Sequence, residues 1–594
     1  MTQFQRAITR QPAVDSRVSS AIGWLVIFLV FLVYLFTLSP TVGLIDSGEL
    51  ATGCYLLNIL HPTGYPLFTI LGRLATLVPL GTVVNRLAVT SALFSTAGVG
   101  LFLLLCRQLG FRPLTSAGVG ALLALSPSIW SVSTDVEVYS LTFLLTISVW
   151  LAAVGCRLSL FGYIAGLTLT NHMSGLTAVL GAMLALIGQH RRHFIRYLTK
   201  IGLFFLLGLS LYLFLLLRAR CEPLFCWGNP VNLERFWWHI TGRQYQVWMF
   251  SLPFSEVIKN GVKGLSLLAR TFGYVLIPFI LIGFFRLFRE KRGLTVGLTL
   301  TILLAFIYAI NYSIPDIEAY YIPALVPLAI FCVAGLDWLS TLGIDLKSKI
   351  KNIGFWILAV VVVMVFFLNY PVQNRRSDWV AYDQAMNTLI SADSNAIIIT
   401  DWWDTYAPIF YLQVIEKVRP DVCIIDKELI RRSWYFNYLA KAYPWLIERS
   451  KSEMENYLIH LNRFEHNIPY NPVAIQESYI NLLRSFILFS PERPAYTTFP
   501  ADANPDAWQL LSGFNLVPVG VLLQIRTDTV IPDFNYSRLR VRLPRFHLDE
   551  RHRVNLDRYR FFVQRRIDLL KAKGREKEAQ DIANWYQETF PRRQ

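Results

Sequence analysis

The stretch AIGWLVIFLVFLVYLFTLSP (residues 21–40) decides the kind of fold that this chain adopts. It carries no charge and approaches the roughly 20 apolar residues that a helix needs to cross a bilayer. Of all 594 residues, 54% are hydrophobic and only 16% are charged, against roughly 25% charged in soluble domains. The sequence therefore predicts a polytopic α-helical membrane protein and excludes a soluble enzyme for most of its length.

Comparable apolar stretches recur up to about residue 370 and predict about eleven membrane crossings. Two of them are short and meet at Asn171-His172, so the count depends on how that pair is arranged. The predicted crossings are 21–38, 87–105, 114–128, 138–155, 159–171, 173–188, 201–217, 268–288, 294–311, 320–340 and 354–369.

The basic residues predict how the chain is oriented. Residues 1–370 hold 26 basic and 13 acidic residues, so most of the net charge of +16 lies in the apolar part. Basic residues in short loops mark the cytoplasmic side, and we therefore predict a cytoplasmic N-terminus and no nucleic-acid partner. The residues assigned to the inner side are Arg6, Arg10, Arg17, Arg107, Arg112, Arg157, Arg191, Arg192, Arg196, Lys200, Arg286, Arg289, Lys291, Arg292, Lys347, Lys349 and Lys351.

Most acidic residues of the apolar part fall on the opposite, outer side. Carboxylates from at least four loops are thus expected at one membrane face, at the ends of helices. A transporter would instead carry its coupling groups near the middle of the bilayer. The outer acids are Asp46, Glu49, Asp135, Glu137, Glu222, Glu234, Glu256, Asp316 and Glu318.

The first outer loop contains Asp46-Ser-Gly-Glu49, a short apolar helix, and the turn His61-Pro-Thr-Gly-Tyr-Pro66. An Asp followed three residues later by a Glu is typical of a capping box at a helix start. The same geometry also aims a carboxylate into a membrane-surface cavity, where it can act as a general base toward an acceptor hydroxyl. The two interpretations are compatible, because a rigidly capped carboxylate is also well positioned.

These motifs resemble the GT-C membrane glycosyltransferases. The resemblance is strongest to the branch of the transmembrane-protein O-mannosyltransferase and its bacterial relatives, although Thr63 stands where relatives commonly have a second Pro. It covers residues 20–370 in order. Besides DSGE (46–49) and HPTGYPLF (61–68), the matching segments are TDVEVY (134–139), LTNH (169–172), WGNP (227–230), WHITGRQY (238–245) and NYSIPDIE (311–318).

The resemblance implies an inverting transfer of a sugar, a hexose such as mannose, from a polyprenyl-phosphate donor. The acceptor is a hydroxyl of a protein, lipid or glycan on the extracytoplasmic face. Carried over to this chain, the base is Asp46, and Glu49 is its neighbour, which caps the helix or orients the acceptor.

A phosphate at the membrane interface needs cationic partners. The candidates for binding the donor and its phosphate are Arg218, Arg243, His61, Tyr65 and His172. The alternative role for Arg218 and Arg243 is anchoring at the membrane interface. The alternative for His172 is a purely structural role. A second acidic cluster is predicted from Asp135, Glu137, Asp316 and Glu318, which helix-start positions would also explain. Trp237, Trp238 and Tyr245 suit an interfacial aromatic belt, with sugar stacking as the alternative.

The remainder of the chain predicts an extracytoplasmic α/β domain with helices. Residues 396–400 and 422–425 are typical of buried strands and flank a helix, which indicates a parallel βαβ unit. A helical hairpin near 554–590 resembles a single tetratricopeptide unit, and the basic stretch 538–566 suits a solvated face or contact with anionic lipid headgroups. We expect acceptor recognition or a lid. The predicted parts are 1–20 (tail), 21–370 (GT-C-like catalytic domain), 371–530 (α/β domain) and 531–594 (hairpin).

The sequence defines no cofactor. The seven cysteines show no CxxC spacing, which argues against zinc and a disulfide framework, although Cys221 and Cys226 share a loop. A divalent metal (Mg or Mn) is left open. The absence of an endoplasmic-reticulum retention signal favours the bacterial inner membrane. The alternatives to a transferase are a transporter or flippase and a non-enzymatic scaffold.

Overall fold

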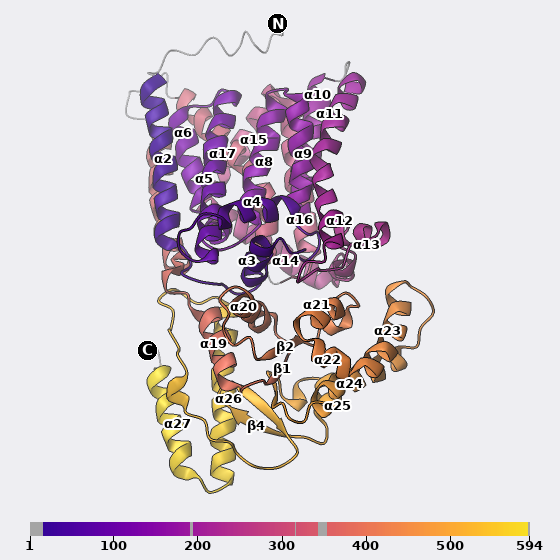
Figure 1. The fold of residues 1–594 in the computed structure, drawn as a ribbon. Coiled ribbons are helices and arrows are strands. Elements are labelled where there is room, and N and C mark those ends of the chain that lie inside the picture. Colours follow the sequence, from indigo (N-terminus) through magenta and orange to yellow (C-terminus); the bar gives the residue numbers. More distant parts are fainter. Residues whose placement is uncertain (1–15, 191–193, 315, 343–352, 592–594) are drawn as a thin grey trace.

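A computed structural model describes residues 16–190, 194–314, 316–342 and 353–591 (Figure 1). The N-terminal two thirds form a bundle of roughly parallel helices, and the C-terminal third forms a separate α/β layer against one end of it. The helices α3 and α4 lie at that end of the bundle, and α20 lies directly beyond α3. Predictions that concern Arg6, Arg10, Arg191, Arg192, Lys347, Lys349 and Lys351 lie outside the described residues.

The bundle is made of long apolar helices interrupted by shorter ones. Its helices are α2 (Ser16–Thr37), α3 (Ser47–Leu56), α4 (Pro66–Thr76), α5 (Val83–Leu109), α6 (Pro113–Ala124), α7 (Pro127–Ser133), α8 (Tyr139–Val154), α9 (Leu158–Asn171), α10 (Leu176–His190), α11 (Phe194–Leu209), α12 (Leu213–Arg220), α13 (Leu233–Ile240), α14 (Phe254–Thr271), α15 (Ile277–Glu290), α16 (Arg292–Ile310), α17 (Ile322–Leu342) and α18 (Ile353–Gln373).

The predicted count of eleven crossings is not confirmed. Among the described residues, six helices are long and apolar enough to cross a membrane, or seven if α6 and α7, bent by 66°, are one span. Helices such as α8 are shorter than a full crossing. The predicted crossing at 268–288 is wrong as one helix, because the chain breaks between α14 and α15, where Gly273 and Tyr274 both adopt a φ of 59°.

The predicted inner residues Lys291 and Arg112 lie at one end of the bundle. At the end away from the α/β layer, Lys291 Nζ donates to the carbonyl oxygen of Leu109, and the Arg112 amide donates to Asp337. The predicted outer acids Asp46 and Asp135 lie at the other end, next to α3 and α20. Which face is cytoplasmic stays a prediction.

Glycines let neighbouring helices approach closely in the bundle. A Cβ at Gly283 of α15 would clash with the Phe331 carbonyl of α17, and one at Gly335 would clash with the Phe279 carbonyl. Small residues at such crossings allow backbone-to-backbone packing, which drives helix association in lipid.

The C-terminal part is built on a five-stranded mixed sheet of order β2-β1-β3-β5-β4. The strand β1 pairs in parallel with both β2 and β3, whereas β5 pairs antiparallel with β3 and β4. This confirms the predicted βαβ unit. The elements are α19 (Val380–Ser391), β1 (Ile397–Thr400), α20 (Trp403–Val414), β2 (Cys423–Asp426), α21 (Tyr435–Ala442), α22 (Pro444–Arg449), α23 (Lys451–Glu465), α24 (Pro472–Leu488), β3 (Ala495–Thr497), α25 (Pro505–Leu511), β4 (Asn515–Val519), β5 (Leu522–Arg526), α26 (Glu550–Ala572) and α27 (Glu576–Thr589).

The close crossing of α15 and α17 generates a testable prediction. Gly283→Val should lower the thermal midpoint and the yield of folded protein, because the added side chain forces the two backbones apart. Gly202→Val on α11 is the matched control, since nothing lies within 4 Å of a Cβ there. The measurement is heating followed by gel filtration in detergent. Equal midpoints for the two variants would contradict the proposed packing.

Candidate active site

The motif DSGE lies where the bundle meets the α/β layer. Asp46 directly precedes α3, and Glu49 sits in its first turn. The capping-box interpretation is wrong, because the Asp46 side chain makes no capping hydrogen bond. Glu49 instead accepts hydrogen bonds from the backbone amide and from Nδ1 of His61, at 2.8 and 2.7 Å. Neither carboxylate therefore caps α3.

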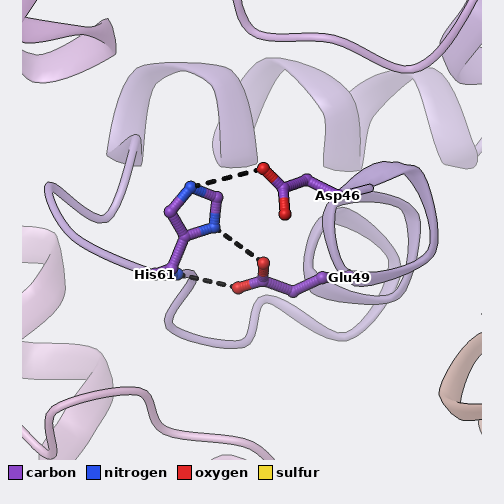
Figure 2. A group of neighbouring side chains, drawn as sticks. All are labelled: Asp46, Glu49 and His61. Carbon is purple, nitrogen blue, oxygen red and sulfur yellow. Dashed lines mark hydrogen bonds and ion pairs between the residues drawn. The ribbon is translucent and has the colours of Figure 1, made fainter. Parts of the chain in front are cut away.

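His61 lies between the two carboxylates of this motif (Figure 2). Its Nε2 is 3.7 Å from Asp46 Oδ2, and its Nδ1 contacts Glu49. Burial alone would lower the pKa of His61, but Glu49 and Asp46 together raise it to about 9. His61 is thus an imidazolium at neutral pH and partly neutralises the pair.

Asp46 and Glu49 differ in how accessible they are. The Asp46 side chain is 24% exposed, whereas that of Glu49 is only 2% exposed. Burial raises the pKa of Asp46, and the charge of Glu49 raises it further, while His61 opposes the shift. A carboxylate with a raised pKa that a substrate can reach suits a general base.

The carboxylate oxygens and imidazole nitrogens of Asp46, Glu49 and His61 are the kinds of atom that bind divalent cations. One ligand atom from each of Asp46, Glu49 and His61 lies within 4.8 Å of the others. However, a protonated imidazole has no lone pair, and His61 Nε2 also lies 2.8 Å from the hydroxyl of Tyr65, which itself donates to the Pro62 carbonyl. Without loss of that proton His61 cannot coordinate a cation, so no metal is assigned to this group.

The second acidic cluster is largely brought together near the same place. Ser47 Oγ donates to Asp135 at 3.0 Å, and the Tyr139 hydroxyl lies 3.3 Å from Asp316 Oδ2. Burial raises the pKa of Asp135 to about 6, and it also raises the pKa of Asp316, to which the charge of Asp46 adds.

Glu137 joins this cluster, whereas Glu318 has a different partner. Burial raises the pKa of Glu137 well above its usual range, and Asp316 and Asp46 add to the shift. The charge that acts most strongly on Glu318 is that of Arg270. Glu137 and Asp316 therefore sense the charge of Asp46, and Asp135 contacts Ser47 of the same motif.

Aromatic rings line the neighbourhood of His61. The ring of Tyr65 stacks on His172 with centroids 5.8 Å apart, and Tyr245 faces His61 at 6.3 Å. Burial and the charge of His61 lower the pKa of His172 to about 3, so His172 is neutral at physiological pH. It can offer hydrogen bonds but no charge to a phosphate. Trp237 is 62% exposed, which suits the predicted aromatic belt.

The two predicted phosphate-binding arginines contact other groups. Arg218 donates to the carbonyls of Leu57 and Leu56, at the end of α3. Arg243 stacks over Trp238 and donates to the Glu465 carbonyl in α23. Arg218 also borders an apolar groove of about 660 Å³, lined by Tyr163, Leu167, Leu207, Gly208, Ser210, Leu211, Leu213, Phe214, Leu217 and Cys221. Phosphate binding by either arginine stays a prediction.

The sequence did not predict that the C-terminal part contacts Asp46, although Asp401 and Asp404, which follow a buried strand, suit either a site or a helix start. Trp403 Nε1 donates to Asp46 Oδ1 at 2.8 Å, and Asp404 accepts a hydrogen bond from the Ile45 amide. The available signal was the sequence Asp401-Trp-Trp-Asp404 directly after a buried strand, where α/β proteins often carry functional groups. The basic stretch 538–566 is not simply a solvated face, because Arg551 pairs with Asp404 and Arg566 is 1% exposed. Cys221 and Cys226 are both free thiols.

The fold resembles that of solved GT-C glycosyltransferases. ArnT from Cupriavidus metallidurans bound to undecaprenyl phosphate aligns with a TM-score of 0.51 and 12% identity, over 87% of this chain and 99% of that chain. Its apo form aligns with a TM-score of 0.52 and 12% identity, over 85% and 98%. At such low identity the likeness shows the fold alone, and that fold is of the GT-C class.

Sequence comparisons find similarity to one group of glycosyltransferases, the protein O-mannosyl-transferases. Residues 46–194 match the protein O-mannosyl-transferase TMEM260 N-terminal domain, and residues 381–446 match TMEM260-associated domain 2. Protein O-mannosyl-transferase TMEM260 of Mus musculus is 26% identical over 439 residues, which are 67% of this chain and 61% of the relative. Its counterpart in Dictyostelium discoideum is 23% identical over 470 residues, or 68% and 57%.

These matches confirm the resemblance to the transmembrane O-mannosyltransferase branch. The chain spans about three fifths of the length of these two curated relatives. Both come from eukaryotes, so they give no support to the expected bacterial inner membrane.

The His61 pair predicts a pH-dependent stability. A proton held more tightly in the folded state stabilises it fully below pH 6.5, and this contribution is lost as the pH rises through about 9. The thermal midpoint should therefore fall over this range, and less steeply in His61→Gln. Scanning fluorimetry in detergent measures both curves.

His552 titrates in the same pH range as His61 and is present in both the unaltered protein and His61→Gln. Asp378 and Asp549 raise the pKa of His552 to about 9 against the effect of burial. Because His552 is present in both proteins, the difference between the curves reports His61. Parallel curves would mean that His61 is not held as an imidazolium.

Proposed function

We propose that this protein is an inverting membrane glycosyltransferase that moves mannose from a polyprenyl-phosphate donor to a hydroxyl group, with Asp46 as the general base. The observation that carries the proposal is the pairing of Asp46 with His61 and Trp403 at the end of an apolar bundle. The names of the relatives support a protein hydroxyl as acceptor and mannose as the sugar.

In the proposed reaction the acceptor hydroxyl attacks the anomeric carbon of the donor. The new carbon–oxygen bond forms as the bond to the phosphate oxygen breaks, the hydroxyl proton passes to Asp46, and polyprenyl phosphate leaves with the electron pair. Attack opposite the leaving group inverts the anomeric centre. Asp46 is assigned as base rather than Glu49 because Glu49 is buried and holds His61.

The lipid part of the donor is assigned to the membrane face of the bundle. The groove beside Arg218 opens between α9 and the α11–α12 segment and is lined by apolar side chains. A polyprenyl chain suits such a surface, and ArnT, which shares the fold, is described in complex with undecaprenyl phosphate. A transporter or flippase is less favoured, because the acids gather at the end of the bundle.

We further propose the division predicted from the sequence, with residues 21–370 as the catalytic membrane domain and residues 371–530 and 531–594 as extracytoplasmic parts. The end of the bundle that carries Asp46 then faces away from the cytoplasm. Assignment to the bacterial inner membrane stays a prediction.

Substitution of the base tests the proposal. Asp46→Asn should lower transfer from radiolabelled polyprenyl-phosphate mannose to a serine- and threonine-containing peptide by about 10²–10⁴-fold, because an amide cannot accept the proton. Asparagine keeps an oxygen for the Trp403 N–H, so the fold and donor binding should persist. Normal transfer by this variant would remove Asp46 from the mechanism. No transfer by the unaltered protein, with lipid movement in proteoliposomes, would favour the flippase.

The proposed topology is tested with two native thiols. Cys221 is exposed near the end of α12, beside the end of α3, and Cys156 is exposed at the opposite end of the bundle, after α8. A membrane-impermeant maleimide applied from outside intact cells should label Cys221 and spare Cys156, and both should react after permeabilisation. The reverse pattern would place the candidate site in the cytoplasm.

A further inference from the structure

The C-terminal part reaches into the site through the start of α20. Trp403 Nε1 donates to Asp46 Oδ1 at 2.8 Å, and Asp404 Oδ1 accepts from the amide of Ile45 at 2.9 Å. A Cβ at Gly48 would clash with the Ala407 carbonyl, so α3 and α20 touch backbone to backbone. Two neighbouring side chains of α20 thus bind two neighbouring residues before α3.

Asp404 is itself firmly held. Its side chain is completely buried, and Arg551 of α26 donates to its two oxygens at 2.6 and 2.7 Å. Asn555 of the same helix adds a hydrogen bond at 2.9 Å. A buried carboxylate needs such compensation, and the result is a fixed acceptor aimed at the loop before α3.

That loop is strained where Asp404 holds it. Ile45 has a φ of 61°, which is unfavourable for a β-branched residue. Such a conformation persists only where its surroundings impose it, and it is often found at functional sites. The hydrogen bond from the Ile45 amide to Asp404 is one such constraint, and it sets the direction in which the next residue, Asp46, leaves the backbone.

We propose that Trp403 and Asp404 are positioning residues for Asp46, so that the C-terminal part completes the active site instead of only covering it. This inference rests on the proposed role of Asp46 as base. The Trp403 N–H occupies Oδ1 and leaves Oδ2, the oxygen that faces His61 at 3.7 Å, to receive the proton.

The Trp403 hydrogen bond also affects the titration of Asp46. Burial is the largest influence and raises the pKa of Asp46, while the Trp403 N–H lowers it. Loss of that N–H should therefore raise the pKa further. The titratable and charged groups that act on Asp46, or on which Asp46 acts, are Glu49, His61, Tyr65, Glu137, Tyr245, Tyr312, Asp316 and Arg551.

The test is Trp403→Phe, which keeps an aromatic ring but removes the donor. We expect kcat for mannosyl transfer to fall about 10- to 100-fold, as for loss of a hydrogen bond to a charged group, with little change in KM for the donor. The acid limb of the pH–rate profile should move to higher pH. Trp403→His, which retains a ring N–H, should recover part of the activity.

The neighbouring residue provides a matched control. Trp402 donates its Nε1 to Asn555 Oδ1 at 3.1 Å. Asn555 holds Asp404 through its Nδ2, so Trp402→Phe removes an equivalent donor from the same segment but leaves the hydrogen bonds to Asp404 and Asp46 in place. It should therefore leave kcat and the pH profile close to those of the unaltered protein. Equal effects of the two substitutions would reduce Trp403 to a structural role and overturn the inference.

A second measurement does not depend on sugar transfer. Carbodiimide labelling of Asp46, quantified by peptide mass spectrometry against pH on monodisperse protein, follows its protonation directly. Trp403→Phe should shift the labelling curve to higher pH, and Trp402→Phe should not. Coincident curves would overturn the inference. If the unaltered protein transfers no sugar but the curves shift, the proposed function fails while the contact stands.

Discussion

A positive charge held by two carboxylates, one buried and one partly exposed, is the constraint around which the candidate site is arranged. Asp46 and Glu49 lie at the start of one short helix and His61 follows its end. Each charge alone would be costly to bury where water is scarce. Together they leave one accessible carboxylate with an elevated proton affinity. The rings of Tyr65 and Tyr245 pack near His61, and Tyr65 also stacks on His172.

Elements from distant parts of the chain hold α3 in place. Arg218 holds the carbonyls at its C-terminal end, and α20 packs against its N-terminal end. The helix is thus fixed at both ends by elements from distant parts of the chain. The groove beside Arg218 and the polar cluster of Asp46 approach the two ends of the same helix, an arrangement suited to a substrate with an apolar tail and a polar head.

Local patterns in the sequence were enough to predict much of this structure. The apolar stretches predicted the bundle, and the isoleucines around 397–399 predicted β1 because a buried parallel strand needs such a run. The crossing at 268–288 failed because composition does not report a backbone break at Gly273 and Tyr274. The polar helix α23 was missed because it lacks a strong apolar stripe.

The same limit applies to the site. The spacing of Asp46 and Glu49 favoured a helix cap, but Glu49 accepts a hydrogen bond from the His61 amide instead. A local spacing pattern does not report a partner twelve residues away. Charge sorting predicted a shared cluster for Asp135 and Asp316, and in the structure Asp135 contacts Ser47 and Asp316 contacts Tyr139. Trp403 contacts Asp46 although 357 positions separate them in the sequence. Only the tertiary fold brings that pair together.

The separation of Trp403 from Asp46 by 357 positions has a consequence during biosynthesis. A chain is made from its N-terminus, and its parts fold as they emerge. The segment that carries Asp46 is therefore inserted at the membrane long before Trp403 has been synthesised. In a nascent or truncated chain the Asp46 side chain would lack its partner in α20. The site would be complete only after the C-terminal part packs against the bundle.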